Sequence, residues 1–383
     1  MSTATTAPPG AGADARTAAA ELAPVLAAAA DRQERDCRMP ADVAAAMAGT
    51  GLSRMLVPRH LGGMESTPVE FAAALETCGR ASASGGWCVM ISASTAMLAG
   101  WLEEPFAAEV FGDPAGCWAG AFAPTGRAAT TDRGFELTGR WSFGSGCDNA
   151  TWFGAGAFDD GGFALHFVPA REVTIHPNWD VLGLRGTGSH DWSVDRAEVP
   201  AGRQVRMLDG SPVSDAPLYR VPLFGMLAAG IAAVGLGVGA AALDSFTELA
   251  GGKVPALQSK ALAQRAGVQA QVGVAVTKLA SARAHLHEQL DAAYSEAVAG
   301  AEQPSTARRV ALRGAAAHAS LVAAEVTSTL YTLAGGTSIR NDHPLGRLFR
   351  DAHVVTQHIM VSGSIYEVVG RAALGIDLDR LDI

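Results

Sequence analysis

The fold is decided by four short runs of sequence: FELTGRWSF (135–143), ATWFGAGAF (150–158), FALHFVP (163–169) and HDWSVDRAEVP (190–200). Their alternation of apolar and other residues is typical of strands with one buried face. The turn-forming segments DDGG (159–162) and HPNWD (176–180) separate some of these runs. Strands of this length at this spacing predict a compact β-domain, either a small barrel or a sandwich.

The sequence on both sides of these runs has the periodicity of helices. Residues 18–36, 40–56 and 68–102 are helical in pattern, and Pro40 and Pro68 stand where a helix tolerates proline. Long helical segments follow at 218–249, 259–299, 305–334 and 351–375, which predicts an antiparallel bundle. We therefore expect a mostly α protein with a central β-domain: a tail (1–16), an N-terminal helical domain (17–115), the β-domain (116–205) and a four-helix bundle (206–383).

Charge and cysteine content exclude several classes of protein. The net charge of −9, without a run of Lys or Arg, argues against a nucleic-acid partner. The five cysteines are widely spaced and form no CxxC, so neither a disulfide framework nor a zinc site is indicated. Reduced thiols and the lack of a secretory pattern in residues 1–20 favour a cytoplasmic enzyme.

Residues 221–243 form a stretch of 23 residues without a charge, long enough to span a bilayer. The stretch is rich in Gly and Ala and has no basic flank, which favours a buried helix over membrane contact. Within it, GLGVGA (235–240) fits the dinucleotide-binding pattern. That pattern needs a strand before it and a second strand after its helix, whereas both flanks here read as helical. Close helix packing is the simpler explanation.

Other common catalytic motifs do not occur in this sequence. It contains no GxSxG, Walker loop or HExxH, which removes the usual hydrolase, nucleotide-hydrolysing and zincin readings. His353 and His358 are five residues apart, and His285 and His287 are two apart. Neither spacing places both rings on one face of a helix, so we expect no metal site.

Four segments, in this order, resemble the acyl-CoA dehydrogenase superfamily. They are DRQERDCRMPADVAAAMAGTGLSRMLVPRHLGG (31–63), GRWSFGSGCDNATWF (139–153), LGLRGTGSHDWSVDRAEVP (182–200) and LAGGTSIRNDHPLGRLFRDAH (333–353). The resemblance covers nearly the whole chain from about residue 30. It implies a flavin-dependent oxidoreductase with helical N- and C-terminal domains around a β-domain.

The resemblance also suggests residues for the flavin site. Ser145 falls where family members place a hydroxyl that reaches flavin N5, and its glycine neighbours would let the backbone approach the ring. Other residues are expected to contact the cofactor through its ring or its phosphates: Trp87, Phe122, Trp179, Gly335 and Gly336. The plainer alternatives are a strand bulge at Ser145, core packing for the aromatic residues and a helix cap at the glycine pair.

The catalytic residue distinguishes two branches of this family. Dehydrogenases carry a Glu base shortly after the Arg-Asp pair, here Arg350-Asp351, and the corresponding position is Ile359. The next carboxylate, Glu367, follows eight residues later. The adjacent His358 resembles the flavin-dependent two-component monooxygenases of this fold. In those enzymes, reduced FMN or FAD from a separate NAD(P)H flavin reductase reacts with O₂ to give a C4a-hydroperoxide. A His at this position can hydrogen-bond the peroxide or the flavin ring and adjust its protonation, because the unperturbed pKa of His lies near neutrality.

Two alternative functions are compatible with the sequence: an acyl-CoA dehydrogenase with a displaced base, and a non-catalytic relative. The simplest alternative for His358 is a structural histidine on a helix, without a catalytic role. Several family hydroxylases carry a second His after the Trp87-type residue, but CVMISASTAMLAGWL (88–102) has only Ser92, Ser94 and Thr95 as polar candidates. This favours an indole, polyketide or amine substrate over a phenol. The resemblance further implies a homotetramer.

Overall fold

The computed structural model describes residues 14–378. Most of the expected tail, residues 1–13, therefore lies outside the described residues. The first helix, α1 (Ala15–Asp36), begins two residues before the predicted domain. Asp14 caps it by accepting a 2.8 Å hydrogen bond from the backbone N–H of Thr17, which satisfies one of the unpaired amides of the first turn.

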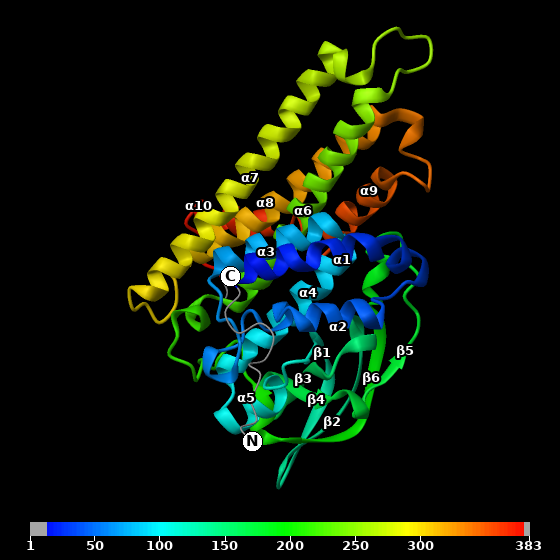
Figure 1. The fold of residues 1–383 in the computed structure, drawn as a ribbon. Helices are drawn as coiled ribbons and strands as arrows, with labels where there is room; N and C mark the ends of the chain where they lie inside the picture. Colours follow the sequence, from blue (N-terminus) through cyan, green and yellow to red (C-terminus); the bar gives the residue numbers. More distant parts are fainter. Residues whose placement is uncertain (1–13, 379–383) are drawn as a thin grey trace, which may run out of the picture.

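The N-terminal region is helical, as the periodicity predicted. It contains α1, α2 (Ala41–Gly49), α3 (Pro68–Ala81), α4 (Ala83–Ala96) and α5 (Glu104–Phe111). A reciprocal capping box between Thr67 and Glu70 begins α3, and Pro68 occupies the first position of the helix. α3 and α4 pack against the C-terminal helices, and α4 also contacts the sheet, so α4 lies between the two (Figure 1).

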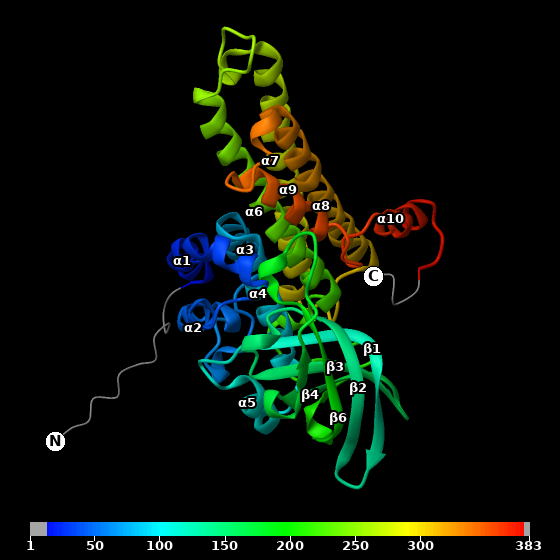
Figure 2. The same ribbon diagram turned by 90° about the vertical axis from the view of Figure 1, so that its right-hand side faces the viewer.

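The central region is one seven-stranded mixed sheet. Its strands are β1 (Trp118–Thr131), β2 (Gly134–Gly144), β3 (Trp152–Asp159), β4 (Gly162–Pro169), β5 (Thr174–His176), β6 (His190–Pro200) and β7 (Gln204–Val205). Their order is β5-β6-β2-β1-β3-β4-β7, with β1 and β3 parallel and the other pairs antiparallel. Figure 2 shows β1 and β2 as long, curved strands. Trp141 and Trp192 stack at 4.5 Å in the core.

The C-terminal region, as far as residue 378, has three long helices and two short ones. They are α6 (Leu223–Gly252), α7 (Ala266–Val298), α8 (Thr306–Ala334), α9 (Pro344–Val355) and α10 (Ile365–Ala373). The prediction of one continuous fourth helix over 351–375 is wrong. Turns at 356–364 interrupt it, in a stretch that contains Ser362, Gly363 and Ser364, residues that compete with helical hydrogen bonding or lower helix propensity. The long predicted helix from 259 likewise begins only at Ala266.

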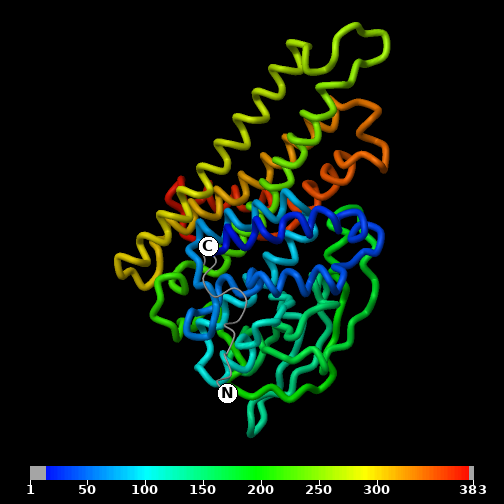
Figure 3. The backbone as a smooth tube through the Cα atoms, viewed as in Figure 1, coloured from blue at the N-terminus to red at the C-terminus, as the bar shows by residue number. Residues whose placement is uncertain are grey.

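The apolar helix α6 lies inside the protein. Of its most apolar 18-residue window, 83% is buried, against α3, α4, α8 and α9. The GLGVGA motif lies in the middle of this helix, with no strand before it, so the dinucleotide reading is wrong. A side chain on Gly237 would overlap the backbone oxygen of Glu76, and one on Gly79 would lie 2.7 Å from the Val234 oxygen. The glycines allow close packing of α3 and α6. The segment between α6 and α7 extends away from the sheet (Figure 3).

Candidate functional site

A distortion at the end of β2 directs Ser145 into the protein. The register with β6 shifts between Trp141 and Gly144, as in a β-bulge. Phe143 has a φ of 65°, uncommon for a bulky residue, and its side chain is 70% exposed. The backbone N–H of Ser145 closes a tight turn to the Phe143 oxygen at 2.8 Å. Ser145 itself is buried. The bulge predicted as the plain alternative is thus present, and it is what orients the hydroxyl.

Ser145 belongs to a continuous row of polar groups. The indole N–H of Trp87 donates to its hydroxyl at 3.0 Å. The Ser145 hydroxyl lies 2.7 Å from that of Ser189, which lies 2.6 Å from that of Thr187. The Thr187 hydroxyl donates to the backbone oxygen of Leu184 at 2.8 Å. We call Ser145, Ser189 and Thr187 the hydroxyl relay.

His358, in the turn segment after α9, lies against the ring of the same tryptophan. Its ring centroid is 5.8 Å from that of Trp87, with an edge-on interplanar angle of 60°. Its Nδ1 accepts a hydrogen bond from the backbone N–H of Met360 at 3.2 Å. Since a nitrogen that accepts carries no proton, the proton of the neutral ring sits on Nε2. His358 therefore presents an N–H donor.

The surroundings of His358 keep the ring neutral. Burial, followed by the positive charge of the buried Arg313 on α8, lowers the pKa of His358 to about 4. At neutral pH the imidazole is then an uncharged donor rather than a cation. Beside it, Ile359 is 70% exposed and Val361 is fully buried.

The remaining predicted cofactor residues fall into two groups. Trp179 is half-buried, and its ring lies 6.1 Å from that of Phe143, so it flanks the bulge. Phe122 on β1 is half-buried against the main core. Gly335 and Gly336, in contrast, are exposed at the far end of α8, about 22 residues or roughly 33 Å along the helix from Arg313. Within one chain the structure does not bring this pair to Trp87.

The Arg-Asp signature fastens the loop before β6 to α9. The buried carboxylate of Asp351 accepts a 2.6 Å hydrogen bond from the backbone N–H of Leu184. Arg350 donates to the Leu182 oxygen at 2.9 Å and to Glu34 on α1 at 2.6 Å. Because Leu184 also ends the hydroxyl relay, the signature fixes one wall of the site.

Sequence reasoning missed several residues that shape this site. Ser189 and Thr187 lie in the quoted segment LGLRGTGSH, where two hydroxyl residues alternate with glycines, a pattern that could have marked them. Arg313 is a cation in an alanine-rich helical stretch, and its burial could not be read from periodicity. Ser92, one of the polar residues in the stretch that lacks the second His, accepts from the backbone N–H of Trp118 and ties β1 to α4.

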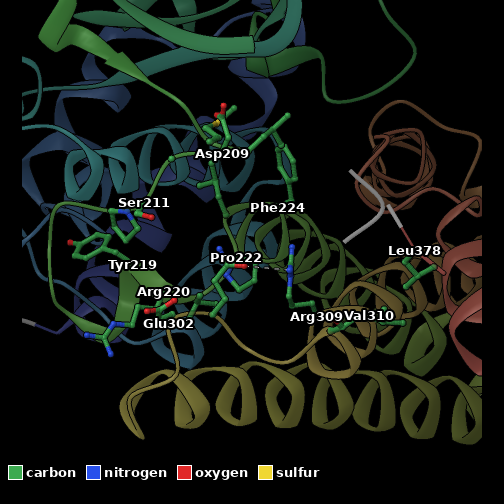
Figure 4. A pocket seen from close by; sticks show the side chains of 18 of the residues that line it. Asp209, Ser211, Tyr219, Arg220, Pro222, Phe224, Glu302, Arg309, Val310 and Leu378 are labelled. Carbon is green, nitrogen blue, oxygen red and sulfur yellow. Dashed lines mark hydrogen bonds between the residues drawn. The ribbon is translucent and has the colours of Figure 1, made fainter. Parts of the chain in front are cut away.

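A large cavity lies elsewhere. It has a volume of about 1590 Å³ and is lined mainly by the segment 207–224, the α7–α8 connection and the end of α10 (Figure 4). Its labelled side chains include Asp209, Arg220 and Glu302. Trp87, Ser145 and His358 are not among the described residues that line it.

Among residues 14–378 no group of three or more His, Cys, Asp or Glu side chains could hold a metal ion. All five cysteines are free, and four of them are buried. Burial raises the pKa of Cys147 to about 12 and that of Cys117 to about 11, so these thiols stay protonated.

Comparison with known proteins identifies the family. Residues 13–104 match the model of the acyl-CoA dehydrogenase N-terminal domain, and residues 229–363 match that of the acyl-CoA dehydrogenase C-terminal domain. Indole-3-acetate monooxygenase of Pseudomonas putida is 35% identical over 352 residues, covering 90% of this chain and 89% of its own. The chain belongs to the flavin-dependent monooxygenase branch of the acyl-CoA dehydrogenase superfamily.

Two further relatives of this monooxygenase agree with that assignment. The oxygenase component of an FADH₂-dependent resorcinol hydroxylase from Rhizobium sp. is 27% identical, covering 94% of this chain and 93% of its own. The crystal structure of 3-HSA hydroxylase from Rhodococcus sp. RHA1 superposes with a TM-score of 0.90 at 27% identity, covering 97% of this chain and all of that one. The predicted fold class is thereby confirmed.

The residues of the monooxygenase fit a flavin. A flavin ring needs flat apolar walls and a few polar atoms aimed at its edge. Trp87 provides a buried planar side chain, and Phe143 an exposed one on the bulge. Ser145 and His358, which both contact Trp87, provide a hydroxyl and an N–H. Gly146, which follows Ser145, has a φ of 73°, a backbone conformation that favours glycine.

Proposed function

We propose that this monooxygenase is the oxygenase component of a two-component system that hydroxylates a small aromatic compound. It uses O₂ and reduced flavin, which a separate NAD(P)H-dependent reductase delivers. The observation that carries the proposal is the grouping of a neutral His358 with Trp87 and Ser145, in a family member that lacks the dehydrogenase base.

Each side chain of the site has a separate role in this proposal. Reduced flavin, when bound, supplies the two electrons that activate O₂. The Nε2–H of His358 would donate a hydrogen bond to the bound oxygen species. The low pKa keeps the ring uncharged, and the Met360 N–H bonded to Nδ1 keeps its single proton on Nε2. Ser145 would hold the edge of the flavin ring through its hydroxyl. The buried faces of Trp87 and Val361 exclude water, which would otherwise release hydrogen peroxide.

An indole-type substrate is favoured over a phenol. Two curated relatives, from P. putida and Acinetobacter baumannii, are named indole-3-acetate monooxygenase and are 35% and 32% identical to this chain. A phenol would profit from a base on α4, where Ser92 is instead bonded to the backbone of β1. An indole needs no such proton removal before hydroxylation.

The preferred flavin is a separate question. Anaerobic titration of the protein with reduced FMN and with reduced FAD identifies it.

The test couples the purified protein to a flavin reductase, NADH and O₂, with indole-3-acetate, indole and resorcinol as substrates. We expect a hydroxylated product from an indole. His358→Ala should divert most of the consumed NADH to hydrogen peroxide. The matched control is His353→Ala, because His353 is also half-buried but bonds to Ser328 on α8 and lies against Phe349 with its ring tilted by 58°. Normal coupling in His358→Ala removes His358 from the mechanism.

The acyl-CoA dehydrogenase alternative is disfavoured by the positions of its residues. Ile359, in register with the usual base, cannot remove a proton, and Glu367 is exposed on α10. If the alternative held, an acyl-CoA would bleach bound oxidised FAD without O₂. We expect no bleaching.

We further propose a cytoplasmic homotetramer in which a neighbouring chain completes the flavin site. In support, Gly335 and Gly336 are exposed and far from Trp87 in the single chain, and Ile339 beside them is 72% exposed. Ile359 and Leu374 are also largely exposed around α10. Light scattering should give four times the mass of the chain, and Ile339→Asp should lower both that mass and flavin affinity. A monomer with full flavin affinity contradicts this proposal.

A further inference from the structure

The hydroxyl relay has a fixed direction. Each hydroxyl carries one hydrogen. The Thr187 hydroxyl must donate its hydrogen to the Leu184 oxygen, because a carbonyl can only accept a hydrogen bond. Ser189 must therefore donate to Thr187 across their 2.6 Å contact. Ser145 must in turn donate to Ser189 across 2.7 Å.

This direction leaves Ser145 as an acceptor. Its single hydrogen points to Ser189, and Trp87 already donates to its oxygen. One lone pair on the Ser145 oxygen remains. Toward a ligand, the hydroxyl therefore accepts a hydrogen bond but has none to donate.

The end of the relay is held firmly, so its direction does not reverse easily. Leu184 is buried with a φ of 52°, and its N–H is bonded to the buried Asp351. The Leu184 oxygen faces the Thr187 hydroxyl and also accepts from the backbone N–H of Thr187 and the indole of Trp179. Rotating the Thr187 hydrogen away would leave two acceptors 2.8 Å apart.

The two redox states of a flavin differ in what they require of such a group. N5 of oxidised flavin is a bare acceptor, whereas N5 of reduced flavin carries a hydrogen. We propose that Thr187 and Ser189 are positioning residues that hold the Ser145 hydroxyl as an acceptor and thereby make the site select reduced over oxidised flavin. The inference rests on the proposed function, in which Ser145 faces the edge of the flavin ring. It gives the protein a means to capture the reduced cofactor and release the oxidised one.

The test measures the dissociation constants of oxidised and of reduced FMN and FAD for the full-length protein, the reduced forms anaerobically. The main variant is Thr187→Val, which keeps the shape but removes the terminal donor. Ser189 can then donate to Ser145, which frees the Ser145 hydrogen for oxidised flavin. Ser189→Ala frees the same hydrogen by a different route. Thr187→Ser retains the relay.

A matched control separates this effect from loss of stability. Thr327→Val on α8 removes a buried hydroxyl that likewise donates to a backbone oxygen, that of Ala323, away from the relay. Thermal melting of each variant confirms folding. If Thr187→Val does not fold, Ser189→Ala carries the same prediction.

We expect the native protein to bind reduced flavin more tightly than oxidised flavin. Thr187→Val and Ser189→Ala should each lower that preference about tenfold, equivalent to about 30 mV in the two-electron potential of the bound flavin. Thr187→Ser and Thr327→Val should keep it. Equal affinity for both states in the native protein, or an unchanged preference in the folded relay variants, overturns the inference while leaving the monooxygenase assignment intact. Absence of binding in either state refutes the proposed function as well.

Discussion

Replacing Asp351 by Asn tests the loop anchor of the site. The Asp351 carboxylate is fully enclosed, and burial is the main reason that its pKa rises from 3.8 to about 7, although the hydrogen bond from the Leu184 N–H opposes the rise. Asparagine keeps an oxygen for that hydrogen bond and carries no charge. The substitution therefore removes the cost of a buried charge and leaves the anchor in place.

The sign and size of the effect follow from the two pKa values. Because the folded-state pKa is the higher one, the folded protein holds its proton over a pH range where the unfolded chain has lost it. The contribution of Asp351 to stability therefore falls as pH rises from about 4 to about 7, by about 4 kcal/mol in total. Between pH 5 and pH 8 the change is about 2 to 3 kcal/mol. The Asp351→Asn variant should lack this pH-dependent loss of stability.

The assay is urea unfolding of both proteins at pH 5 and pH 8, at one protein concentration. From pH 5 to pH 8, the free energy of unfolding of Asp351→Asn should rise by about 2 to 3 kcal/mol relative to that of the native protein. Asp159→Asn is the control. Burial works to raise the pKa of Asp159, but hydrogen bonds, chiefly from Arg206, outweigh it and hold the pKa below 3.8. Asp159→Asn should be less stable at both pH values without a gain between them. A parallel response of native protein and Asp351→Asn would refute the reasoning.

Three further predictions concern single side chains. Trp87→Phe loses the indole hydrogen bond to Ser145 and should lower the free energy of unfolding by about 1 kcal/mol in urea unfolding; an unchanged free energy would contradict this contribution. Arg313→Gln removes a charge that disfavours the imidazolium, so the pKa of His358 should rise above about 4 in an NMR titration, while burial, the larger cause, still holds it below 6.5; an unchanged pKa would contradict the contribution of Arg313. Gly183→Ala places a Cβ 2.7 Å from the α9 backbone and should cost about 1 to 3 kcal/mol of unfolding free energy, whereas Gly251→Ala, with open space around it, should cost nothing; equal melting temperatures would count against the packing argument.

The order of helical and β regions could be predicted because it is written in local periodicity. Alternation over a few residues predicts a strand, and the spacing of apolar residues along 68–102 predicts helices, without reference to distant parts of the chain. Start signals such as Pro68 after Thr67 are likewise local. Turns are local as well, yet the interruption at 356–364 was missed because its apolar residues continue the helical spacing on either side.

The sequence by itself determined the fold class, and register against Arg350-Asp351 singled out His358 in place of a dehydrogenase base. Only the tertiary structure decided what surrounds that residue: Trp87 from α4, Arg313 from α8 and the relay that begins at Ser145. The physical reason is that the pKa of His358 and the direction of the Ser145 hydroxyl depend on contacts between separate elements, such as the contact of Ser145 with Trp87, 58 residues away, and these contacts leave no periodic trace in the sequence.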